Sequence, residues 1–312
     1  MLITNTLAAK TFKKLAMIIN PAAGKGQFVA GLSRAVQHFC LNGYCVTIYM
    51  TEKKDDASAF AQLCGAEYEI LVCCGGDGTL NETINGLMKH TRLPALGYIP
   101  LGTTNDFANS LGLPKNPRKA AETIMTSNPT AIDVGLFGST YFTYIAAFGI
   151  FTDVSYTTPQ ETKHALGSLA YFLEGLTRLG DIPVYHAVLE HDLGRVEGDF
   201  IFGGVTNSMS VAGLVKLKPD FVSLTDGYFE VFLVKPPQNM GQLQRIISGF
   251  ITQNYDPECV VLLQTTAVTF HFDKPVAWTR DGENGGEHRD ISIRCLPGKL
   301  PFLIEPTKTG SA

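Results

Sequence analysis

An aspartate enclosed by glycines is the feature of this sequence that points most directly to chemistry. The segment Gly75-Gly76-Asp77-Gly78-Thr79 follows an apolar run, residues 70–74, that is typical of a buried strand. Glycines let backbone N–H groups approach a polyphosphate closely, and the start of a following helix adds partial positive charge. A carboxylate in such a loop repels the phosphates unless a cation or a positioned water lies between them. The segment therefore predicts a phosphate-binding loop that works with magnesium.

Two more loops of the same kind occur in the first part of the chain. Residues 20–26, Asn-Pro-Ala-Ala-Gly-Lys-Gly, follow the apolar run 15–19, and residues 100–106, Pro-Leu-Gly-Thr-Thr-Asn-Asp, follow the run 96–99. None of the three loops matches the Gly-x-x-x-x-Gly-Lys-Ser/Thr nucleotide loop or the Gly-x-Gly-x-x-Gly dinucleotide loop. Together they predict a site for nucleotide phosphates, while a P-loop nucleotidase or an ordinary dehydrogenase is disfavoured.

Structural roles could also account for the acids of these loops. Thr79 and Glu82 have the Thr-x-x-Glu spacing of a capping box, in which both side chains satisfy N–H groups at a helix start. Asp106 could be an acid in the first turn of a helix, where the helix dipole favours a negative charge. Asp77 is harder to explain in this way because glycines flank it. For Glu82 and Asp106, both kinds of role remain open.

Acids also lie beside turn signals in the second half of the chain. Asp281-Gly282 and Gly285-Gly286 are ordinary turn signals on either side of Glu283, and Asp226-Gly227 is a strong hairpin signal. Glu283 could therefore be a solvent-facing residue of a hairpin. A carboxylate within reach of a hydroxyl group can instead take its proton as a general base. Taken alone, the pattern favours the hairpin.

Alternating strand and helix patterns organise the first part of the chain. Apolar runs typical of strands alternate with segments in which apolar residues recur at helical spacing; the strands are expected at 15–19, 46–50, 70–74 and 96–99, and the helices at 28–39, 55–64 and 80–87. This alternation predicts a doubly wound, mostly parallel α/β domain with helices on both faces of its sheet. Ligands of such folds bind beyond the carboxyl ends of the strands.

Short β-rich runs replace this pattern after Asp133. Such runs, separated by turn residues, predict a mostly antiparallel β-sandwich; the clearest are 141–148, 184–190, 200–205, 228–234 and 267–272. One helical stretch, residues 164–179, has an apolar stripe that is more typical of core packing than of a lipid-binding surface. We expect a nucleotide-binding domain over residues 1–133, a β-rich domain over 134–290, and a C-terminal segment, 291–312, that returns to the first domain.

Composition limits the partners and the compartment. The 312-residue chain has a net charge of -4 and a pI of about 6.0, so no overall positive field would hold nucleic acid or an anionic membrane. Its seven cysteines lack Cys-x-x-Cys spacing, which predicts neither a disulfide framework nor a zinc site. The first residues lack the apolar stretch of a secretory signal, so we expect a cytoplasmic protein. The uncharged run 134–152 approaches membrane-span length, but glycines, threonines and serines interrupt it and favour buried strands.

The first-domain motifs resemble a known family. Residues 75–82, Gly-Gly-Asp-Gly-Thr-Leu-Asn-Glu, together with residues 100–108, Pro-Leu-Gly-Thr-Thr-Asn-Asp-Phe-Ala, resemble the catalytic domain of bacterial diacylglycerol kinases, a fold that sphingosine and ceramide kinases share. Residues 20–25 resemble the first loop of this family, with Ala23 where a serine is common. That loop works through backbone amides, so the change should cost little.

The resemblance continues in the second domain and covers nearly the whole chain. It includes Thr-Asn-Ser at 206–208, Thr-Asp-Gly-Tyr-Phe at 225–229, and Asp-Gly-Glu-Asn-Gly-Gly at 281–286. The Gly-Gly-Asp-Gly-Thr core alone also occurs in NAD kinases. The specificity of the match therefore comes from the order of the motifs along the chain.

This resemblance implies an ATP-dependent lipid kinase, with conversion of diacylglycerol to phosphatidic acid as the leading reaction and the β-rich domain as the lipid-substrate domain. Asp77 and Asp106 would serve the catalytic magnesium and phosphate network, and Glu283 would be the general base that takes the proton of the lipid hydroxyl. The residues expected to bind the ATP phosphates and ribose are Asn20, Pro21, Ala22, Ala23, Gly24, Thr51, Gly76, Asp77, Gly78, Thr79, Leu80, Asn81, Glu82 and Thr103.

The resemblance also implies a second, mainly structural magnesium site. Asp226 matches its ligand, with help from Ser223 and Tyr228 through side-chain or main-chain atoms. The family often has another acid directly before this aspartate, where this chain has Thr225. A threonine supplies no charge, so the affinity of the site for magnesium is in question.

Several alternatives stay open at this stage. The acceptor could be another lipid alcohol, such as phosphatidylglycerol or a sphingoid base, or a soluble molecule such as NAD. A protein that binds a nucleotide or lipid without turnover is disfavoured because acids stand at all four matching positions. We expect transient contact with a membrane surface, since no lipidation motif or spanning helix is evident. A homodimer is plausible if the β-rich domain exposes a sheet edge.

Overall fold

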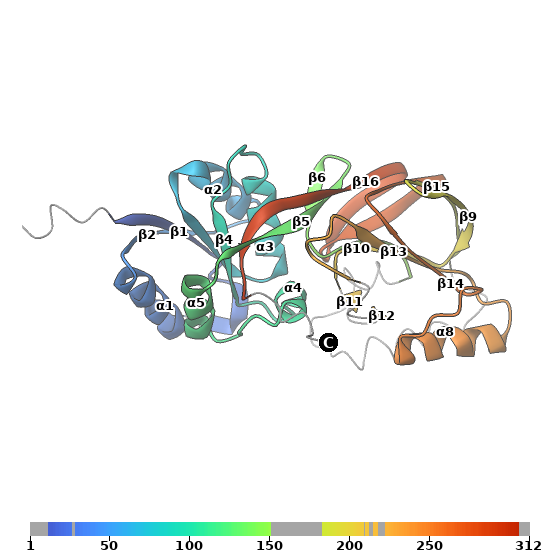
Figure 1. Cartoon of the computed structure of the whole chain (residues 1–312), viewed down its shortest axis with the longest axis horizontal. Helices are drawn as coiled ribbons and strands as arrows, with labels where there is room; N and C mark the ends of the chain where they lie inside the picture. Colours follow the sequence, from blue (N-terminus) through green and yellow to red (C-terminus); the bar gives the residue numbers. More distant parts are fainter. Residues whose placement is uncertain are drawn as a thin grey trace, which may run out of the picture. The chain divides into compact units, whose positions relative to one another are not determined.

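The computed structural model describes residues 12–26, 29–150, 183–208, 210–211, 215–217 and 222–305. The chain forms two compact units, both visible in Figure 1. The first comprises Met1–Thr130 and Leu300–Ala312, and the second comprises Ala131–Lys299. The first unit is therefore built from two separate stretches of sequence.

A parallel sheet forms the centre of the first unit. Its strands run in the order β2-β1-β3-β4, and all neighbours in this set are parallel. The last residues of β16 (Glu283–Leu303) belong to this unit and join the sheet, because Phe302 pairs in parallel with Leu96 of β4. The strand bounds are β1 Lys13–Ile19, β2 Tyr44–Met50, β3 Ile70–Gly75 and β4 Ala95–Pro100.

Helices cover both faces of this sheet (Figure 1). Helices α1 and α5 pack on one face, and α2 packs against α3 on the other. The bounds are η1 Ala23–Gly26, α1 Val29–Leu41, α2 Asp56–Cys64, η2 Gly65–Glu67, α3 Asp77–Leu87, α4 Asp106–Ser110 and α5 Pro117–Thr126. This arrangement confirms the predicted doubly wound α/β domain.

The continuous apolar runs of the first unit arise because its central strands are buried on both faces. Leu15 and Met17 of β1 point to the core under α1 and α5, whereas Ala16 and Ile18 point to the opposite face, and all four are fully buried. At roughly 1.5–3 kcal/mol for each large buried apolar side chain, this burial is a major source of the unit's stability. The helices are therefore held by packing and not by their propensity alone.

Antiparallel strands form most of the second unit. They follow the order β14-β13-β10-β7-β15-β16, with β8 and β9 added beside β15, and with β5 and β6 beside β16. The bounds are β5 Pro129–Phe137, β6 Thr140–Phe142, β7 Ile145–Gly149, β8 Tyr185–His191, β9 Gly194–Phe200, β10 Phe202–Thr206, β11 Ser210–Val211, β12 Val215–Lys216, β13 Phe229–Val234, β14 Val260–Thr265, β15 Ala267–Arg280 and β16 Glu283–Leu303. The mostly antiparallel character is as predicted.

Aromatic side chains fill the core of the second unit. Phe148 of β7 contacts the rings of Phe270, Phe272 and Trp278, with centroids 4.9–5.8 Å apart. These three come from β15, which is long enough to pair with β8 in its first half and with β7 in its second. Offset and edge-to-face contacts of this kind each add roughly 0.5–1.5 kcal/mol to the burial energy. The core therefore fixes β15 and the turn that follows it.

Two helical stretches of the second unit differ from what the sequence predicts or lie beyond the description. The stretch expected at 164–179 lies outside the described residues. Helix α8, Met240–Thr252, was not predicted, although Asn239 caps it by accepting a hydrogen bond from the Gln242 backbone N–H at 2.9 Å. Its buried residues Leu243, Ile246 and Phe250 had the spacing of an apolar stripe. The capping residue and the stripe were both readable in the sequence.

No helix in the described ranges is both long and apolar enough to cross a lipid bilayer. The uncharged run that begins at residue 134 instead forms β5, β6 and β7 as far as Gly149, as predicted.

Candidate functional site

Three loops meet at the carboxyl ends of β1, β3 and β4. Asn20, directly after β1, donates from Nδ2 to Thr79 Oγ1 at 3.0 Å, and its own backbone N–H donates to Cys74 O of β3 at 2.9 Å. The Leu101 backbone N–H donates to Gly75 O at 2.8 Å, which joins the loop after β4 to the end of β3. The structure therefore brings together the three loops that the sequence singled out.

Glycines make this close approach possible. A Cβ on Gly102 would lie 2.6 Å from Gly76 Cα, so the two backbones leave no room for a side chain. Gly24 has a positive φ of 76°, and a Cβ there would meet Leu101 O at 2.7 Å. Each of the three loops thus needs a glycine where it contacts another.

A buried asparagine and tyrosine hold the third loop in shape. Asn105 accepts from the Gly102 backbone N–H at 2.9 Å and donates to Gly102 O at 2.6 Å, with its own backbone in the left-handed region. The Tyr98 hydroxyl donates to Gly75 O at 3.2 Å. Burial, reinforced by the nearby charge of Asp77, raises the pKa of Tyr98 far above its usual value. Tyr98 is therefore a permanent hydrogen-bond donor beneath the loops.

Asp77 lies in the first turn of α3 and accepts hydrogen bonds from the start of another helix. Its two carboxylate oxygens accept from the backbone N–H groups of Asp106 at 3.0 Å and Phe107 at 3.3 Å, the first residues of α4. A negative charge at a helix amino terminus is stabilised by the helix dipole, and here two helices contribute. Asp77 therefore fixes the loop after β4 relative to α3, which is a positioning role.

The capping-box alternative for Thr79 and Glu82 is wrong. Gly76 is the N-cap of α3, so Thr79 already lies inside the helix. Its hydroxyl accepts the bond from Asn20, and its carbonyl accepts from Thr83 Oγ1 at 2.8 Å. Asp106 is the first residue of α4, so the dipole explanation for its charge is physically sound. Both roles remain compatible for Asp106, because a first-turn carboxylate can also face a ligand.

The remaining predicted phosphate residues lie around the same loops. Gly78, Leu80 and Asn81 belong to the first two turns of α3, Thr51 follows β2 and is nearly buried, and Thr103 is exposed in the loop after β4. Pro21, Ala22 and Ala23 form the turn after Asn20, where Asn20 Oδ1 accepts from the Ala22 backbone N–H at 3.0 Å. The first N–H groups of α3 have no partner within the helix and face the loop end. This arrangement can bind an anion through backbone amides.

The predicted magnesium loop lies directly before β13 in the second unit. Asp226 is exposed and accepts from the Tyr228 backbone N–H at 3.0 Å, and Ser223 Oγ accepts from the Thr225 backbone N–H at 3.3 Å. A carboxylate and a hydroxyl are oxygen ligands, which magnesium prefers. Among the described residues no group of three or more His, Cys, Asp or Glu side chains could hold a metal. Asp226 is the one carboxylate of this loop, so a magnesium ion here would be bound through a single charged ligand.

Asp133 supports this loop, a role that the sequence did not predict. Its two oxygens accept from the backbone N–H groups of Gly227 and Gly298, both at 2.7 Å, and its own N–H donates to Leu224 O at 2.8 Å. Burial raises the pKa of Asp133, although its two backbone donors oppose the rise. An acid within the apolar run of β5 was the available signal. Asp226-Gly227 is not a two-residue hairpin, since β13 pairs with β10 and β14.

Glu283 directly follows a tight turn between β15 and β16. The turn residues Asp281 and Gly282 both have positive φ, 47° and 82°, as in a type I′ hairpin, and Glu283 is exposed. The hairpin prediction is thus confirmed at Asp281-Gly282. Gly285 and Gly286, in contrast, lie within β16 at a register shift opposite Trp278, so they do not form a second turn.

The Asp281 carboxylate anchors the turn that presents Glu283. Its oxygens accept from the backbone N–H groups of Thr143 at 2.9 Å, Tyr144 at 2.9 Å and Ile145 at 3.0 Å, and Asp281 is nearly buried. Its backbone N–H donates to Ile145 O at 2.8 Å. Glu283 therefore directly follows a turn that is anchored to residues 143–145, and no local sequence pattern predicts these partners.

Replacing Asp281 with alanine should destabilise the second unit by about 2–4 kcal/mol, because the change leaves three buried N–H groups without an acceptor. Urea unfolding monitored by circular dichroism measures this loss. Asp290→Ala is the control, since Asp290 pairs with His271 at the surface and should contribute less than about 1 kcal/mol. Equal losses in the two variants would contradict the anchoring role.

Glu230 is a second buried acid whose role the sequence did not predict. It lies in β13, fully buried, and its Oε1 accepts from Gln264 Nε2 at 3.2 Å. Its Oε2 has no hydrogen-bond partner in the described part of the chain. Burial raises the pKa of this carboxyl to about 8. Glu230 is therefore a neutral acid in the folded protein at neutral pH.

This raised pKa makes stability depend on pH. Between about 4.5 and about 8 the unfolded chain has released the Glu230 proton and the folded chain retains it, so stability falls as the pH rises. Glu230→Gln cannot ionise and should be more stable than the unmodified protein by roughly 2–4 kcal/mol near pH 8, but by little near pH 5. Urea unfolding at both pH values, with EDTA present to remove bound cations, tests this. The same difference at both pH values would contradict the assignment.

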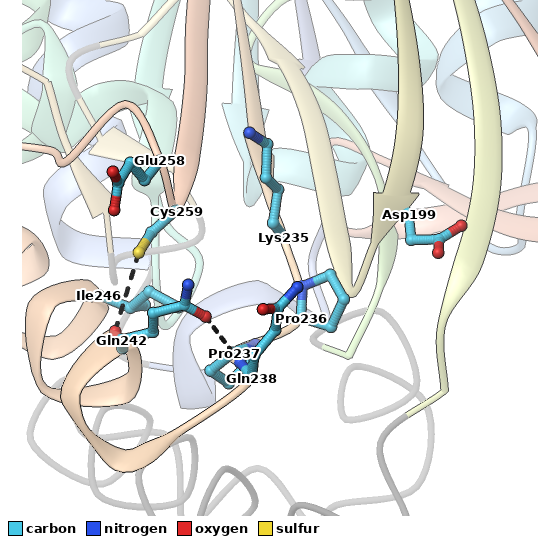
Figure 2. Close-up of a pocket in the computed structure, with 9 residues that line it drawn as sticks. All are labelled: Asp199, Lys235, Pro236, Pro237, Gln238, Gln242, Ile246, Glu258 and Cys259. Carbon is cyan, nitrogen blue, oxygen red and sulfur yellow. Dashed lines mark hydrogen bonds between the residues drawn. The ribbon is translucent and has the colours of Figure 1, made fainter.

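A cavity of about 230 Å³ lies elsewhere in the second unit, between α8, β9 and the segments beside β13 and β14. Figure 2 shows its lining, including the hydrogen bond in which Gln242 Oε1 accepts from the Gln238 backbone N–H at 2.7 Å. The lining residues are Asp199, Lys235, Pro236, Pro237, Gln238, Gln242, Ile246, Glu258 and Cys259. None of the predicted site residues is among them, so this cavity is separate from the candidate site.

Comparisons with known proteins identify the family of the chain. Residues 14–137 match the family of the diacylglycerol kinase catalytic domain. The chain is 33% identical over 294 residues to a diacylglycerol kinase of Bacillus subtilis (strain 168), covering 93% of this chain and 94% of that protein. It is 38% identical over 279 residues to a diacylglycerol kinase of Staphylococcus aureus (strain MRSA252), covering 88% and 87%.

Solved structures share the fold. A putative diacylglycerol kinase from Bacillus anthracis str. Sterne superposes with a TM-score of 0.82 at 24% identity, covering 95% of this chain and 98% of that one. A second structure of a putative diacylglycerol kinase from the same strain gives a TM-score of 0.79. The folds therefore agree over both units. On the sequence matches over nearly its full length, the chain belongs to the diacylglycerol kinase family and is a phosphotransferase.

Proposed function

We propose that this protein transfers the γ-phosphoryl group of ATP to the free hydroxyl of diacylglycerol and so forms phosphatidic acid. The observation that carries the proposal is the meeting of three glycine-containing loops at the carboxyl ends of β1, β3 and β4, beside the start of α3. Loops of this kind suit a polyphosphate. The names of the relatives supply the acceptor, because both sequence relatives are diacylglycerol kinases.

In this proposal the first unit binds ATP. The backbone N–H groups of α3 and of the loop after Asn20 would hold the phosphates, and Thr51 and Thr103 would contact the ribose and phosphate region. Asp77 and Asp106 would act with magnesium, which supplies positive charge to offset the charge of the phosphates. The bonds from Asp77 to α4 support this role, since they fix the third loop for the transfer step.

Glu283 would take the proton of the lipid hydroxyl. As the oxygen of that hydroxyl bonds to the γ-phosphorus, its proton passes to the Glu283 carboxylate, the bond between the γ-phosphorus and the bridging oxygen breaks, and ADP leaves. The exposed position of Glu283 and its fixed turn support this role. Asp226, with Ser223 and Tyr228, would hold a structural magnesium ion, and Asp133 would keep that loop in place.

The acceptor would reach the protein at a membrane surface. Diacylglycerol stays in a bilayer, and no helix in the described ranges could span one, so we propose transient peripheral contact of a cytoplasmic protein. The β-rich unit would hold the lipid.

A panel of acceptors tests this function directly. The purified protein is incubated with magnesium, ATP labelled at the γ-phosphate, and micelles that contain diacylglycerol, phosphatidylglycerol or a sphingoid base, with NAD in a parallel reaction. We expect labelled phosphatidic acid to form faster than any other product. Label in another lipid would show that this lipid, and not diacylglycerol, is the acceptor. Formation of NADP would show that the acceptor is a soluble molecule. ATP binding without transfer to any acceptor would indicate a binding protein.

A further inference from the structure

An apolar stripe runs along the surface of helix α8. Met240 and Ile251 are 57% and 66% exposed, and Ile247 between them is partly exposed. At roughly 100° of rotation per residue, these three positions fall within about 40° of one another, so their side chains share one face of the helix. The buried apolar residues of α8 lie on the neighbouring face. Helix α8, at the periphery of the second unit in Figure 1, therefore has one apolar stripe in the core and a second at the surface.

Exposed apolar residues form a row only on α8 among the described parts of the second unit. The other large exposed apolar residues described there, Val184, Leu193 and Tyr228, lie singly in connecting segments. Single residues of this kind are ordinary on protein surfaces, whereas a continuous apolar patch is typical of a surface that binds an apolar partner. The stripe on α8 therefore indicates a partner.

The polar side of α8 is almost uncharged. Arg245 is the one charged residue of the helix, and its guanidinium pairs with Asp256 at 2.7 Å and with Glu258 at 2.9 Å. The remaining residues that are not apolar are glycine, glutamine, serine and threonine. Helices that lie on anionic membranes are instead rich in lysine and arginine on their polar side. The charge pattern of α8 therefore matches an uncharged apolar partner, and a charged peptide or an anionic membrane would gain few ion pairs from it.

A bilayer that contains diacylglycerol has the kind of surface that this helix fits. The headgroup of diacylglycerol is a single hydroxyl, which covers less area than its two acyl chains, so its presence leaves gaps between the neighbouring phospholipid headgroups and exposes hydrocarbon. Interfacial helices bury their apolar face at the boundary between headgroups and acyl chains, and their binding depends on lipid composition. The net charge of -4 gives no overall attraction to an anionic membrane, so apolar contact is the available source of affinity.

We propose that the exposed stripe of α8, formed by Met240, Ile247 and Ile251, docks the protein on membranes by entering the gaps that diacylglycerol opens between phospholipid headgroups. Docking is then strongest where the acceptor is abundant. The inference rests on the proposed function, because it takes diacylglycerol as the acceptor. It adds the surface that meets the bilayer and an attraction that is apolar and not electrostatic.

Cosedimentation with phosphatidylcholine vesicles, with and without diacylglycerol and in the absence of ATP, tests the docking. We expect tighter binding to the vesicles that contain diacylglycerol, and no loss of binding at high salt, because salt screens only interactions between charges. A double variant, Met240→Gln with Ile251→Gln, should lower the partition coefficient roughly 10-fold or more, since two apolar side chains no longer enter the hydrocarbon. Glutamine is uncharged and a good helix former, so α8 should still fold. Leu193→Gln is the matched control, because Leu193 is 80% exposed in the turn between β8 and β9, and it should leave the binding unchanged.

Activity measurements separate docking from catalysis. The double variant should lose roughly 10-fold or more of its rate on diacylglycerol in vesicles. It should keep its rate on a short-chain diacylglycerol dissolved as monomers, because that acceptor reaches the site without a membrane. If the unmodified protein phosphorylates neither form, the proposed function fails, while vesicle binding still tests the docking.

Four results would overturn the docking proposal. These are vesicle binding that the double variant leaves unchanged, binding that high salt abolishes, an equal loss of rate on both forms of the acceptor, and a change in the sedimentation mass of the double variant in the absence of lipid. The last result would show that a second copy of the chain, and not a bilayer, covers the stripe.

Discussion

Glu283→Gln should lower kcat for phosphatidic acid formation by about 10²- to 10⁴-fold, because the amide cannot take the proton of the lipid hydroxyl. The apparent affinity for ATP should change little, since the side chain acts on the acceptor. Stability should also be unaffected, because Glu283 is exposed at the end of a turn that Asp281 anchors. Initial rates at saturating ATP, together with calorimetric ATP binding, measure these effects.

Glu287→Gln is the matched control for this prediction. Glu287 is another exposed glutamate of β16, four residues farther along the strand, and it should leave the rate within about twofold. Full activity in Glu283→Gln would show that Glu283 is not the general base. Equal losses in the two variants would point to a general effect of charge on this strand.

Asp77→Asn should reduce kcat/KM by at least about 10²-fold. The amide keeps the size of the side chain but loses the charge that the starts of α3 and α4 stabilise, and its NH₂ group faces one of the two backbone N–H groups at Asp106 and Phe107. The third loop would shift relative to the first two, and a displacement of about 1 Å can cost this much in rate. The variant should also lose roughly 1–3 kcal/mol of stability.

Asp56→Asn is a control that distinguishes an effect of Asp77→Asn on catalysis from its effect on stability. Asp56 accepts from the backbone N–H groups of Glu52 and Lys53 at 2.8 and 2.9 Å, at the start of α2, so it makes the same kind of bonds away from the loops. These bonds hold the pKa of Asp56 below its usual value. Asp56→Asn should lose stability but retain kcat/KM. If both variants lose activity in proportion to their stability, Asp77 has no specific role in phosphate transfer.

The parallel sheet could be predicted because burial on both faces leaves a continuous apolar signature. Residues 70–74 are apolar throughout because β3 lies between β1 and β4 with helices above and below. The glycine loops were readable for a similar reason, since Gly24, Gly76 and Gly102 stand where backbones touch. Their meeting follows from the parallel arrangement, which places all strand ends at one edge.

The roles of individual acids were less accessible to sequence reasoning. Asp281 and Asp133 look like ordinary polar residues beside a turn and within a strand, but their acceptor bonds join segments 138 and 94 residues away along the chain. Such partners depend on the completed fold, which no local pattern encodes. Asp77 could be predicted in part. An aspartate between glycines indicated a special role, but its bond to α4 depends on where the fold places the loop after β4.

The predicted start of helix α3 was wrong for a different reason. The segment 75–79 was expected to be a loop because it contains three glycines, yet α3 already begins at Asp77. Glycine is unfavourable within a helix by only about 1 kcal/mol, and packing of Leu80 and Ile84 in the core outweighs that cost. The result favours anion binding, since it places the first N–H groups of the helix at the loop end.

The most direct test of the proposed lipid kinase activity follows the γ-phosphate of ATP in a single turnover with diacylglycerol. With enzyme in excess over ATP labelled at the γ-position, we predict that one labelled phosphatidic acid appears for each ADP formed, and that Glu283→Gln slows the appearance of both. Release of the label as inorganic phosphate, or ADP formation without labelled lipid, would contradict the claim that this chain is a lipid kinase.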